Sequence, residues 1–278
     1  MTTQPKLMGI FAHPDDETLG AGGVFAKYGA EGVETYLVMA TRGERGWQGE
    51  PTANPGLEAL GAFREQELRS AAALLGIRQI DFLNYIDGDL DQAQPAEIIA
   101  KLVGYIRRVR PQVVITFGPD GSYGHPDHIA ISQFTTAAIM QAANPAYSVA
   151  DGCAPHQVAK LYYMVDSVCL AQTLHSLGVN PAIRVDGYER RLIAWEEWAI
   201  TTWVDTSAHW RTVLAAVACH RSQLPNLEEM KLLPDDTQRH LWGCGTFYRA
   251  LSLVNGGRRV EHDLFEGIPF ANGKELVQ

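Results

Sequence analysis

Residues 6–17, KLMGIFAHPDDE, join a short apolar run to a cluster of one histidine and three acidic residues. The apolar part, residues 6–12, is typical of a strand that is buried on both faces of a sheet. In an open parallel sheet, ligands bind beyond the carboxyl ends of the strands, where the loops that lead into helices gather. The charged cluster follows the strand at that place, so it marks a candidate functional site.

Short apolar runs of the same kind recur through the first half of the chain and alternate with stretches of helical spacing. The expected strands are residues 6–12, 34–40, 80–84 and 112–117. Apolar residues within 98–109 recur at a period near 3.6 and predict a helix that Pro95 opens and Pro111 ends. Residues 63–75 predict another helix, ended by Gly76. The alternation predicts an α/β fold whose mainly parallel sheet is covered by helices on both faces.

The second half of the chain is less regular. Strands are expected at residues 160–168 and 199–204, and a helix at residues 210–219. No linker, repeat or low-complexity tract separates this half from the first. We therefore expect one domain over residues 1–278, with an elaborated C-terminal portion.

Composition narrows the class of protein. With 278 residues and 46% hydrophobic side chains, the chain can bury a sizeable core. Its formal net charge of -9 argues against nucleic acid or an anionic membrane as a partner. The basic cluster in the middle of the chain, Arg107, Arg108 and Arg110, is expected to be a solvated helix end.

The N-terminus and the cysteines indicate where the protein is expected to be located and whether its thiols are expected to be oxidised. The N-terminus lacks the basic stretch, apolar core and cleavage site of a signal peptide, and no apolar run reaches membrane-spanning length, so a cytoplasmic protein is expected. The cysteines lie far apart without a C-x-x-C pair, and we expect them to be small buried apolar residues that form no disulfide. They are Cys153, Cys169, Cys219 and Cys244.

The spacing within the first motif suits a metal. His13 and Asp16 are three residues apart, so they can converge on one point as the chain enters a helical turn. Imidazole and carboxylate are ordinary zinc ligands. Asp15 would point away from them and stay free for other work. Taken alone, the same run of acids also fits a helix N-terminus.

A second His-Pro-Asp unit strengthens the metal interpretation. Residues 124–128, GHPDH, follow the expected strand 112–117 just as the first motif follows its own strand. Two loops at one edge of the sheet then supply His13, Asp16 and either His125 or His128. Three protein ligands with an open position are typical of a catalytic zinc.

The sequence resembles the LmbE-like, or PIG-L, family of zinc-dependent N-acetylglucosamine deacetylases. The resemblance rests on four motifs, which are residues 12–17 (AHPDDE), 41–44 (TRGE), 125–128 (HPDH) and 220–223 (HRSQ). It implies a Rossmann-like three-layer sandwich and a bound zinc ion, in a ligand set that also accommodates Fe²⁺. The implied metal ligands are His13, Asp16 and His128.

The resemblance also implies roles for neighbouring residues. Asp15 would be the general base. His125 would stabilise the developing oxyanion or protonate the leaving amine, and Asp127 would orient it. A tyrosine near this motif assists at the carbonyl oxygen in related deacetylases, which makes Tyr123 a further candidate, with a loop aromatic that covers the site as the alternative.

Substrate contacts are implied more weakly. Arg64 and Asp87 resemble the sugar-contacting residues of the family, with an exposed helix cation and a turn residue as the respective alternatives. Trp47 lies in a loop rich in glycine and proline, residues 44–61, where it could stack on a sugar face. His220 belongs to the last motif and could equally be a structural histidine at a helix end.

The expected function is therefore zinc-dependent hydrolysis that removes the N-acetyl group from an N-acetylglucosamine-containing small molecule. One alternative keeps the metal but hydrolyses another amide or an N-glycosidic bond. The other alternative is a catalytically silent metal-binding domain, against which the presence of Asp15 and His125 argues. The expected partner is a small amino-sugar substrate, and the sequence leaves a homo-oligomer open.

Overall fold

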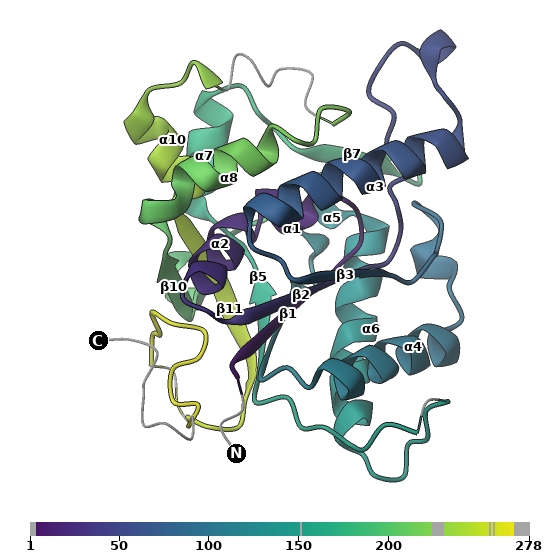
Figure 1. Cartoon of the computed structure of the whole chain (residues 1–278). Helices are drawn as coiled ribbons and strands as arrows, with labels where there is room; N and C mark the ends of the chain where they lie inside the picture. Colours follow the sequence, from purple (N-terminus) through teal and green to yellow (C-terminus); the bar gives the residue numbers. More distant parts are fainter. Residues whose placement is uncertain (1–3, 151, 224–230, 256, 258, 270–278) are drawn as a thin grey trace.

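A mixed sheet lies at the centre of the protein in a computed structural model that describes residues 4–150, 152–223, 231–255, 257 and 259–269 (Figure 1). Within that part of the chain the sheet has seven strands in the order β10-β11-β5-β4-β1-β2-β3. The strands are β1 (Lys6–Phe11), β2 (Glu34–Met39), β3 (Gln79–Phe82), β4 (Val113–Phe117), β5 (Lys160–Met164), β10 (Thr202–Asp205) and β11 (Cys244–Ser252). The expected α/β fold with a mainly parallel sheet is confirmed.

The parallel part of the sheet runs from β5 to β3. Lys6 of β1 pairs with Glu34 of β2, and Leu7 of β1 pairs with Val113 of β4, both in parallel register. β11 runs antiparallel to β5, and β10 runs antiparallel to β11. β1 lies between two neighbours with helices on either side, which is why five of its six residues are buried.

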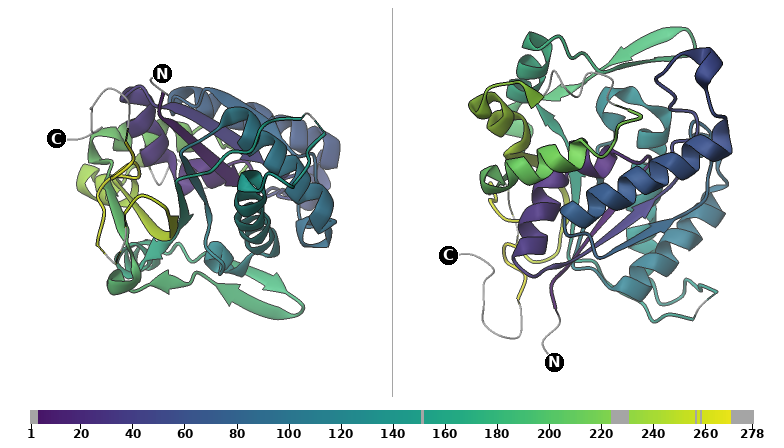
Figure 2. Two further views of the ribbon diagram at one scale, coloured as in Figure 1. Left: turned by 90° about the horizontal axis from the view of Figure 1, so that it is seen from below. Right: turned by 45° about the horizontal axis from the view of Figure 1, so that its top comes forward.

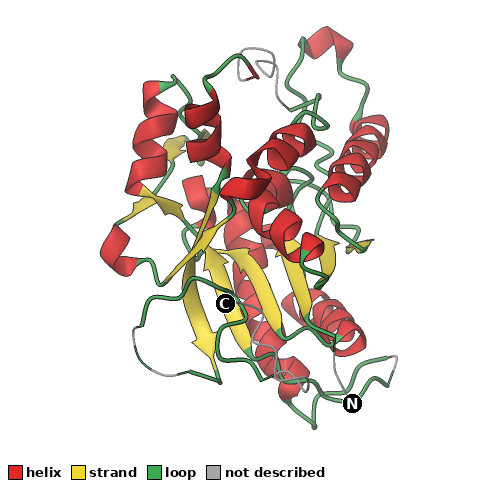
Figure 3. Cartoon of the chain, turned by 60° about the vertical axis from the view of Figure 1, so that its left-hand side comes forward, coloured by secondary structure: helices red, strands yellow, loops and turns green. Residues whose placement is uncertain are grey.

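Helices cover both faces of this sheet (Figure 3). α2, α3 and α8 pack on one face, and α4 and α6 pack on the other (Figure 1). The α-helices are α1 (Asp16–Leu19), α2 (Gly22–Ala30), α3 (Leu57–Leu74), α4 (Pro95–Val109), α5 (Gly121–Gly124), α6 (Pro126–Ala143), α7 (Val168–Ser176), α8 (Trp210–Val217) and α10 (Asp235–Trp242). Short 3₁₀ helices are η1 (Pro51–Ala53), η2 (Leu90–Gln92), η3 (Glu197–Ala199) and η4 (Ser207–His209).

Local signals located some of these elements, whereas helices such as α2 and α6 were not predicted. α4 begins at Pro95 as expected, and Gly76 follows α3 with a φ of 73°, the left-handed conformation that glycine adopts without strain. The expected strand at residues 160–168 is shorter in the structure, because the chain turns after Met164 and forms β6 (Asp166–Ser167) and then α7. In the stretch 199–204 the strand begins only at Thr202, because η3 precedes it.

The second half adds a small substructure that the sequence did not indicate. β7 (Ala182–Val185) and β8 (Tyr188–Arg191) form an antiparallel hairpin, and β9 (Ala194–Trp195) pairs with β6. The hairpin projects from the body of the molecule (Figure 2). Among the described residues, no helix combines the length and apolar character that crossing a membrane would require.

Two expectations about individual side chains are wrong. Arg107 is buried, with 4% of its surface exposed, because its guanidinium donates to backbone carbonyls after and at the end of α6, including those of Ala142 and Asn144. The cysteines are not buried: Cys169 and Cys244 are exposed, since α7 buries none of its residues and Cys244 opens β11. Cys153 and Cys219 are half-buried, and all four are free thiols.

Candidate metal centre and active site

The two His-Pro-Asp motifs meet because β1 and β4 are parallel neighbours. Each strand delivers its motif to the same edge of the sheet, where the chain turns into a helix. After β1, α1 begins at Asp16. After β4, the short helix α5 leads to His125, which is the N-cap residue of α6, and His128 lies in the first turn of α6.

Three potential metal-ligating side chains converge at this edge. Nδ1 of His13 lies 3.2 Å from Nε2 of His128. The carboxylate of Asp16 lies 3.4 Å from Nε2 of His128 and 3.8 Å from Nδ1 of His13. All three residues are buried. Ligands at 2.0–2.1 Å from a tetrahedral zinc stand about 3.3 Å apart, so this donor set fits such an ion.

Hydrogen bonds on the far side of each ring orient these imidazoles. Nδ1 of His128 lies 3.2 Å from the carbonyl of Gly121, which can only accept, so this nitrogen carries a proton. Nε2 of His13 faces the carboxylates of Asp87 at 3.0 Å and Asp127 at 3.1 Å and donates to them. When the rings are neutral, the two nitrogens that face each other therefore carry lone pairs, which is the arrangement a cation requires.

The charges around the triad favour a cation as well. Burial works against a charged His13, but Asp127 and Asp87 outweigh it and raise the pKa of His13 well above its ordinary value. Burial and the proximity of His13 lower the pKa of His128 well below its ordinary value. Burial raises the pKa of Asp16 to about 7, although His13 opposes the shift. The charged forms of His128 and Asp16 are thus disfavoured here, and a bound divalent cation would stabilise a neutral His128 beside an ionised Asp16.

Asp15 stands apart from the triad. Its φ is 110°, and its carboxylate accepts a hydrogen bond from Arg64 at 3.2 Å, whereas that of Asp16 accepts from the backbone N–H of His13. Burial raises the pKa of Asp15 above its ordinary value, although the charge of Arg64 pulls in the other direction. A carboxylate next to a metal triad, with a raised pKa, is suited to accept a proton.

Arg64 and Asp87 are buried and engaged with the protein. Arg64 is only 3% exposed and also donates to the carbonyls of Pro14 at 2.6 Å and Gly43 at 2.9 Å, so the alternative of an exposed helix cation is wrong. Asp87 accepts from the backbone N–H of Arg45 as well as from His13. Their predicted contact with a sugar remains a prediction.

The structure changes the relation between Asp127 and His125. We expected Asp127 to orient His125. The carboxylate of Asp127 instead contacts His13 and accepts from the backbone N–H groups of Gly88 at 2.7 Å and Leu90 at 3.1 Å. The reason is that Asp127, the second residue of α6, faces the loop after β3. What reaches His125 is the backbone N–H of Asp127, which donates to Nδ1 at 3.1 Å.

This hydrogen bond defines the chemistry of His125. Because Nδ1 is an acceptor, Nε2 of the neutral ring carries the proton. Burial and the nearby His13 lower the pKa of His125 to about 4, so the ring is neutral near pH 7. His125 can therefore donate a hydrogen bond without carrying a charge.

The two aromatic candidates differ in placement. Tyr123 is half-buried, and its ring centroid lies 5.3 Å from that of His128 and 5.9 Å from that of His125, so it belongs to the site. Burial and Asp16 raise its pKa, which keeps the phenol protonated. Trp47 instead donates to the carbonyl of Glu50 at 2.9 Å within its own loop, and the described contacts do not bring it to the triad.

Comparisons with known proteins identify the family. The sequence profile described as GlcNAc-PI de-N-acetylase (PIG-L) matches residues 8–139, which contain both His-Pro-Asp motifs. A 1D-myo-inositol 2-acetamido-2-deoxy-alpha-D-glucopyranoside deacetylase of Geodermatophilus obscurus is 32% identical over 97% of this chain and 100% of its own length. The protein of the same name from Mycolicibacterium vanbaalenii is 34% identical over 95% of this chain and 98% of its own. The chain belongs to the PIG-L family.

Solved structures agree on the fold of this PIG-L protein. A conserved protein of Thermus thermophilus matches with a TM-score of 0.63 and 26% identity, covering 90% of this chain and 96% of that one. N,N'-diacetylchitobiose deacetylase from Pyrococcus horikoshii matches with a TM-score of 0.64 and 23% identity, over 88% and 83% of the two chains. A 4-carboxy-2-hydroxymuconate hydratase from Pseudomonas putida reaches 0.65 at 18% identity, over 91% and 99%, so the same fold carries other reactions.

Sequence reasoning missed several residues that shape this PIG-L site. Glu44 of the TRGE motif accepts from the backbone N–H of Asp87 at 3.2 Å and so holds the loop that reaches His13. Arg190 of β8 donates to the carbonyl of Gly124 at 2.9 Å, and Trp195 donates to Asp120 at 2.8 Å. Glu44 could have been found from its motif, whereas no local signal indicates that the hairpin packs against the loop before α6.

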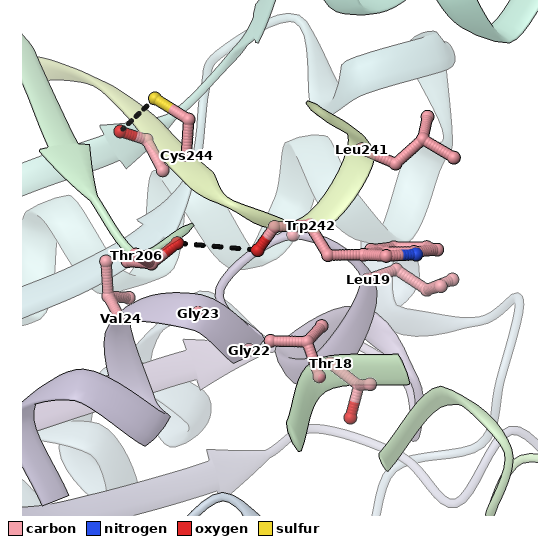
Figure 4. A pocket seen from close by; sticks show the side chains of 12 residues that line it. Thr18, Leu19, Gly22, Gly23, Val24, Thr206, Leu241, Trp242 and Cys244 are labelled. Carbon is pink, nitrogen blue, oxygen red and sulfur yellow. Dashed lines mark hydrogen bonds between the residues drawn. The ribbon is translucent and has the colours of Figure 1, made fainter. Parts of the chain in front are cut away.

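A separate small pocket lies beside α1 and α2 and is distinct from the triad. Its lining includes Thr18, Gly22, Thr206, Trp242 and Cys244 (Figure 4). It contains none of the residues that we assigned to metal binding or catalysis. The pocket therefore does not belong to the candidate site at the two His-Pro-Asp loops.

Proposed function

We propose that this PIG-L family protein is a zinc-dependent N-deacetylase that hydrolyses the acetamide of an N-acetylglucosamine unit in a small molecule. The observation that carries the proposal is the pair of facing ring nitrogens of His13 and His128, which carry lone pairs when both rings are neutral. Asp16 completes the set, and Asp15 is held beside them by a different partner. A metal-binding domain without catalysis would need the three ligands but no separate base.

Three side chains would hold the metal. His13 would bind through Nδ1, His128 through Nε2 and Asp16 through its carboxylate, while Asp87 and Asp127 hold the far side of His13. Nitrogen and oxygen donors of this kind suit Zn²⁺, and they also accommodate Fe²⁺. When bound, such an ion supplies a Lewis acid for the amide carbonyl and lowers the pKa of water to about 7.

Asp15 acts as the base in this proposal. It takes one proton from the attacking water while the water oxygen forms a bond to the carbonyl carbon, and the π electron pair of the carbonyl moves to its oxygen. The raised pKa of Asp15 makes it a stronger base than an exposed aspartate. Arg64 donates a hydrogen bond to the carboxylate of Asp15 and so orients it.

His125 and Tyr123 stabilise the negative charge on that oxygen. Nε2–H of the neutral His125 is the hydrogen-bond donor, and the protonated phenol of Tyr123 is a second donor beside it. The electron pair on the oxygen then re-forms the C=O bond as the C–N bond breaks with its electron pair on nitrogen, and the proton held by Asp15 passes to that nitrogen. The products are the free amine and acetic acid, which ionises to acetate and releases a proton at neutral pH. Of the two roles expected for His125, this geometry favours the oxyanion donor.

The relatives suggest which amino sugar to test first. Two of them, 32% and 34% identical over nearly the whole chain, are named for a myo-inositol glycoside of N-acetylglucosamine. We propose that this protein takes a substrate of the same class. Residues between positions 13 and 220 contribute to the site or contact it, which supports one domain over residues 1–278. The half-buried Trp47 is the candidate for stacking on the sugar.

A substrate panel tests the proposal. The purified protein, loaded with zinc, would be incubated with 1D-myo-inositol 2-acetamido-2-deoxy-alpha-D-glucopyranoside, N,N'-diacetylchitobiose and free N-acetylglucosamine, and the released primary amine would be measured. We expect release from the inositol glycoside to exceed that from the other two. If zinc-loaded protein releases amine from none of them, the acetamide proposal fails, and hydrolysis of another amide or a silent domain becomes the better account.

A further inference from the structure

Asp15 has a backbone conformation that residues with a side chain rarely adopt. Its φ is 110° and its ψ is −27°. A non-glycine residue keeps such a conformation only where its surroundings hold it. The carboxylates of Asp15 and Asp16 have different partners: that of Asp15 accepts from Arg64, and that of Asp16 accepts from the backbone N–H groups of Ala12 and His13.

Glu17 provides one of the constraints. Its Oε2 accepts the backbone N–H of Asp15 at 3.0 Å, and its side chain is fully buried. A buried carboxylate needs partners for both of its oxygens. The other oxygen, Oε1, accepts the hydroxyl of Thr18 and lies 3.1 Å from Nε2 of His220.

Among the described residues, the side chain of His220 makes its hydrogen bonds through Nε2 alone. It follows α8, which packs beside α1 (Figure 1), and it is fully buried. Nε2 also lies 3.2 Å from the hydroxyl of Thr18. Its Nδ1 has no hydrogen-bond partner in the part of the chain that the structure describes. The side-chain hydrogen bonds of this histidine are thus directed at α1.

The residues after His220 contact a different part of the molecule. The backbone N–H and hydroxyl of Ser222 donate to Glu67 of α3 at 2.9 Å and 2.6 Å. Gln223 donates to the carbonyl of Gly46 at 2.8 Å. These contacts fasten the same segment of chain without reaching Glu17 or Asp15, so they offer a matched comparison.

We propose that Glu17 and His220 are positioning residues for Asp15. His220 holds the carboxylate of Glu17, and Glu17 holds the backbone of Asp15 in the left-handed conformation that keeps its side chain off the triad. The role of Asp15 as the base rests on the proposed function, whereas the conformational part stands on the geometry alone. A positioning role differs from a role in stabilising the fold, because every effect of His220 on turnover must then pass through Asp15.

Kinetics of variants test the proposal. His220→Leu removes the donor to Glu17, and we expect kcat for amine release to fall about 10- to 100-fold, the scale on which small misplacement of a reacting group acts. KM and zinc content should stay at the parent values. His220→Gln, whose amide nitrogen can stand near the place of Nε2, should recover most of the loss. Glu17→Gln, whose single amide oxygen cannot replace both carboxylate oxygens, should also lower kcat.

A double variant decides whether the effect passes through Asp15. In an Asp15→Ala background, adding His220→Leu or Glu17→Gln should cause no further loss, because the group being positioned is gone. Ser222→Ala, on the same segment, should keep the parent kcat. Three results would overturn the proposal. The first is parent kcat in both His220→Leu and Glu17→Gln. The others are a full further loss of kcat when either change is added to Asp15→Ala, and a loss in Ser222→Ala equal to that in His220→Leu.

A structural readout separates this inference from the proposed function. In a crystal structure of Glu17→Ala, Asp15 should leave the left-handed region, whatever the parent protein hydrolyses. If Asp15 keeps the φ of 110° that it has in the parent, Glu17 does not hold it and the inference fails. If Asp15 relaxes but the parent releases no amine, only the proposed function fails.

Discussion

Nδ1 of His13 lies 3.2 Å from Nε2 of His128, and the hydrogen bonds on the far side of both rings leave these two nitrogens without a proton when the rings are neutral. Two lone pairs at this distance repel each other unless a proton or a cation lies between them. With Asp16 beside them, the arrangement has the chemistry of a metal site, and this relationship leads to the first prediction.

Substitution of a triad histidine should remove the metal. His13→Ala and His128→Ala each delete one of three ligands, so the purified variants should contain much less zinc than the parent by elemental analysis. His125→Ala is the matched control, because His125 bonds to a backbone N–H and is assigned to the substrate oxygen, and it should keep its zinc. If His128→Ala kept its full zinc and His125→Ala lost it, the roles assigned to the two histidines would have to be exchanged.

The carboxylates behind His13 should tune metal affinity without binding the metal. Asp127→Asn and Asp87→Asn weaken the acceptors of the His13 Nε2–H, and such changes typically cost 10- to 100-fold in affinity, so we expect about that loss for each. A competition titration against a zinc chelator measures it. Parent affinity in the double variant would show that these contacts do not support the ligand.

Loss of Asp15 should separate catalysis from metal binding. Asp15→Asn keeps the size of the side chain but removes the base, so kcat should fall by roughly 10²- to 10⁴-fold while zinc content is unchanged. Asp91→Asn, at an exposed position on η2, serves as the control and should keep the parent rate. Parent turnover in Asp15→Asn would remove this residue from the mechanism.

A buried ion pair far from the site should give a distinct acid dependence of stability. Lys160 and Glu261 are both fully buried and 2.7 Å apart, and the hydroxyl of Tyr162 donates to Glu261. Burial raises the pKa of Glu261, but these hydrogen bonds outweigh it, so the pKa lies below its ordinary value. A lowered carboxyl pKa stabilises the fold above the unfolded value of about 4.3, and this contribution is lost as the pH falls through the folded pKa.

Glu261→Gln tests this contribution. Removal of one partner of a buried pair costs about 3–5 kcal/mol, so we expect that decrease in the free energy of unfolding at pH 7, measured by urea denaturation. The difference from the parent should shrink below about pH 4. Glu266→Gln, which breaks a pair with the exposed Arg259, should cost little at any pH. A difference for Glu261→Gln that stays constant from pH 7 to pH 3 would contradict the assignment.

Titration of Lys160 does not contribute to the pH dependence of stability in the acid range. Burial lowers its pKa more than Glu261 raises it, so the pKa of Lys160 lies below its ordinary value. The unfolded chain then binds this proton more tightly than the folded chain, and the resulting pH dependence falls in the alkaline range. The acid limb therefore reports on Glu261.

The parts of the fold that the sequence predicted are those with local signals. The run at β1 and the 3.6-residue period of α4 are visible in neighbouring residues. β11 could not be predicted in the same way, because it depends on pairing with β5 and β10, which are distant in the sequence. The burial of Arg107 was missed for the same reason, since its acceptors lie at and after the end of α6.

In the candidate site, too, the features with a local signal could be predicted and those that depend on distant contacts could not. The triad could be predicted because each motif follows a strand, and parallel neighbouring strands bring their carboxyl ends together. The contact of Asp127 with His13 could not, because it requires the loop after β3 to supply N–H groups from Gly88 and Leu90 to the other side of the carboxylate. A short motif shows which residues gather, but not which of them bond to each other.

One measurement tests the central claim most directly. The protein would be depleted of metal with a chelator, and amine release from 1D-myo-inositol 2-acetamido-2-deoxy-alpha-D-glucopyranoside would be followed before and after zinc is added back. The account predicts no release from the depleted protein and recovery in proportion to the zinc bound. Equal release with and without metal would contradict the assignment of His13, Asp16 and His128 as the centre of the reaction.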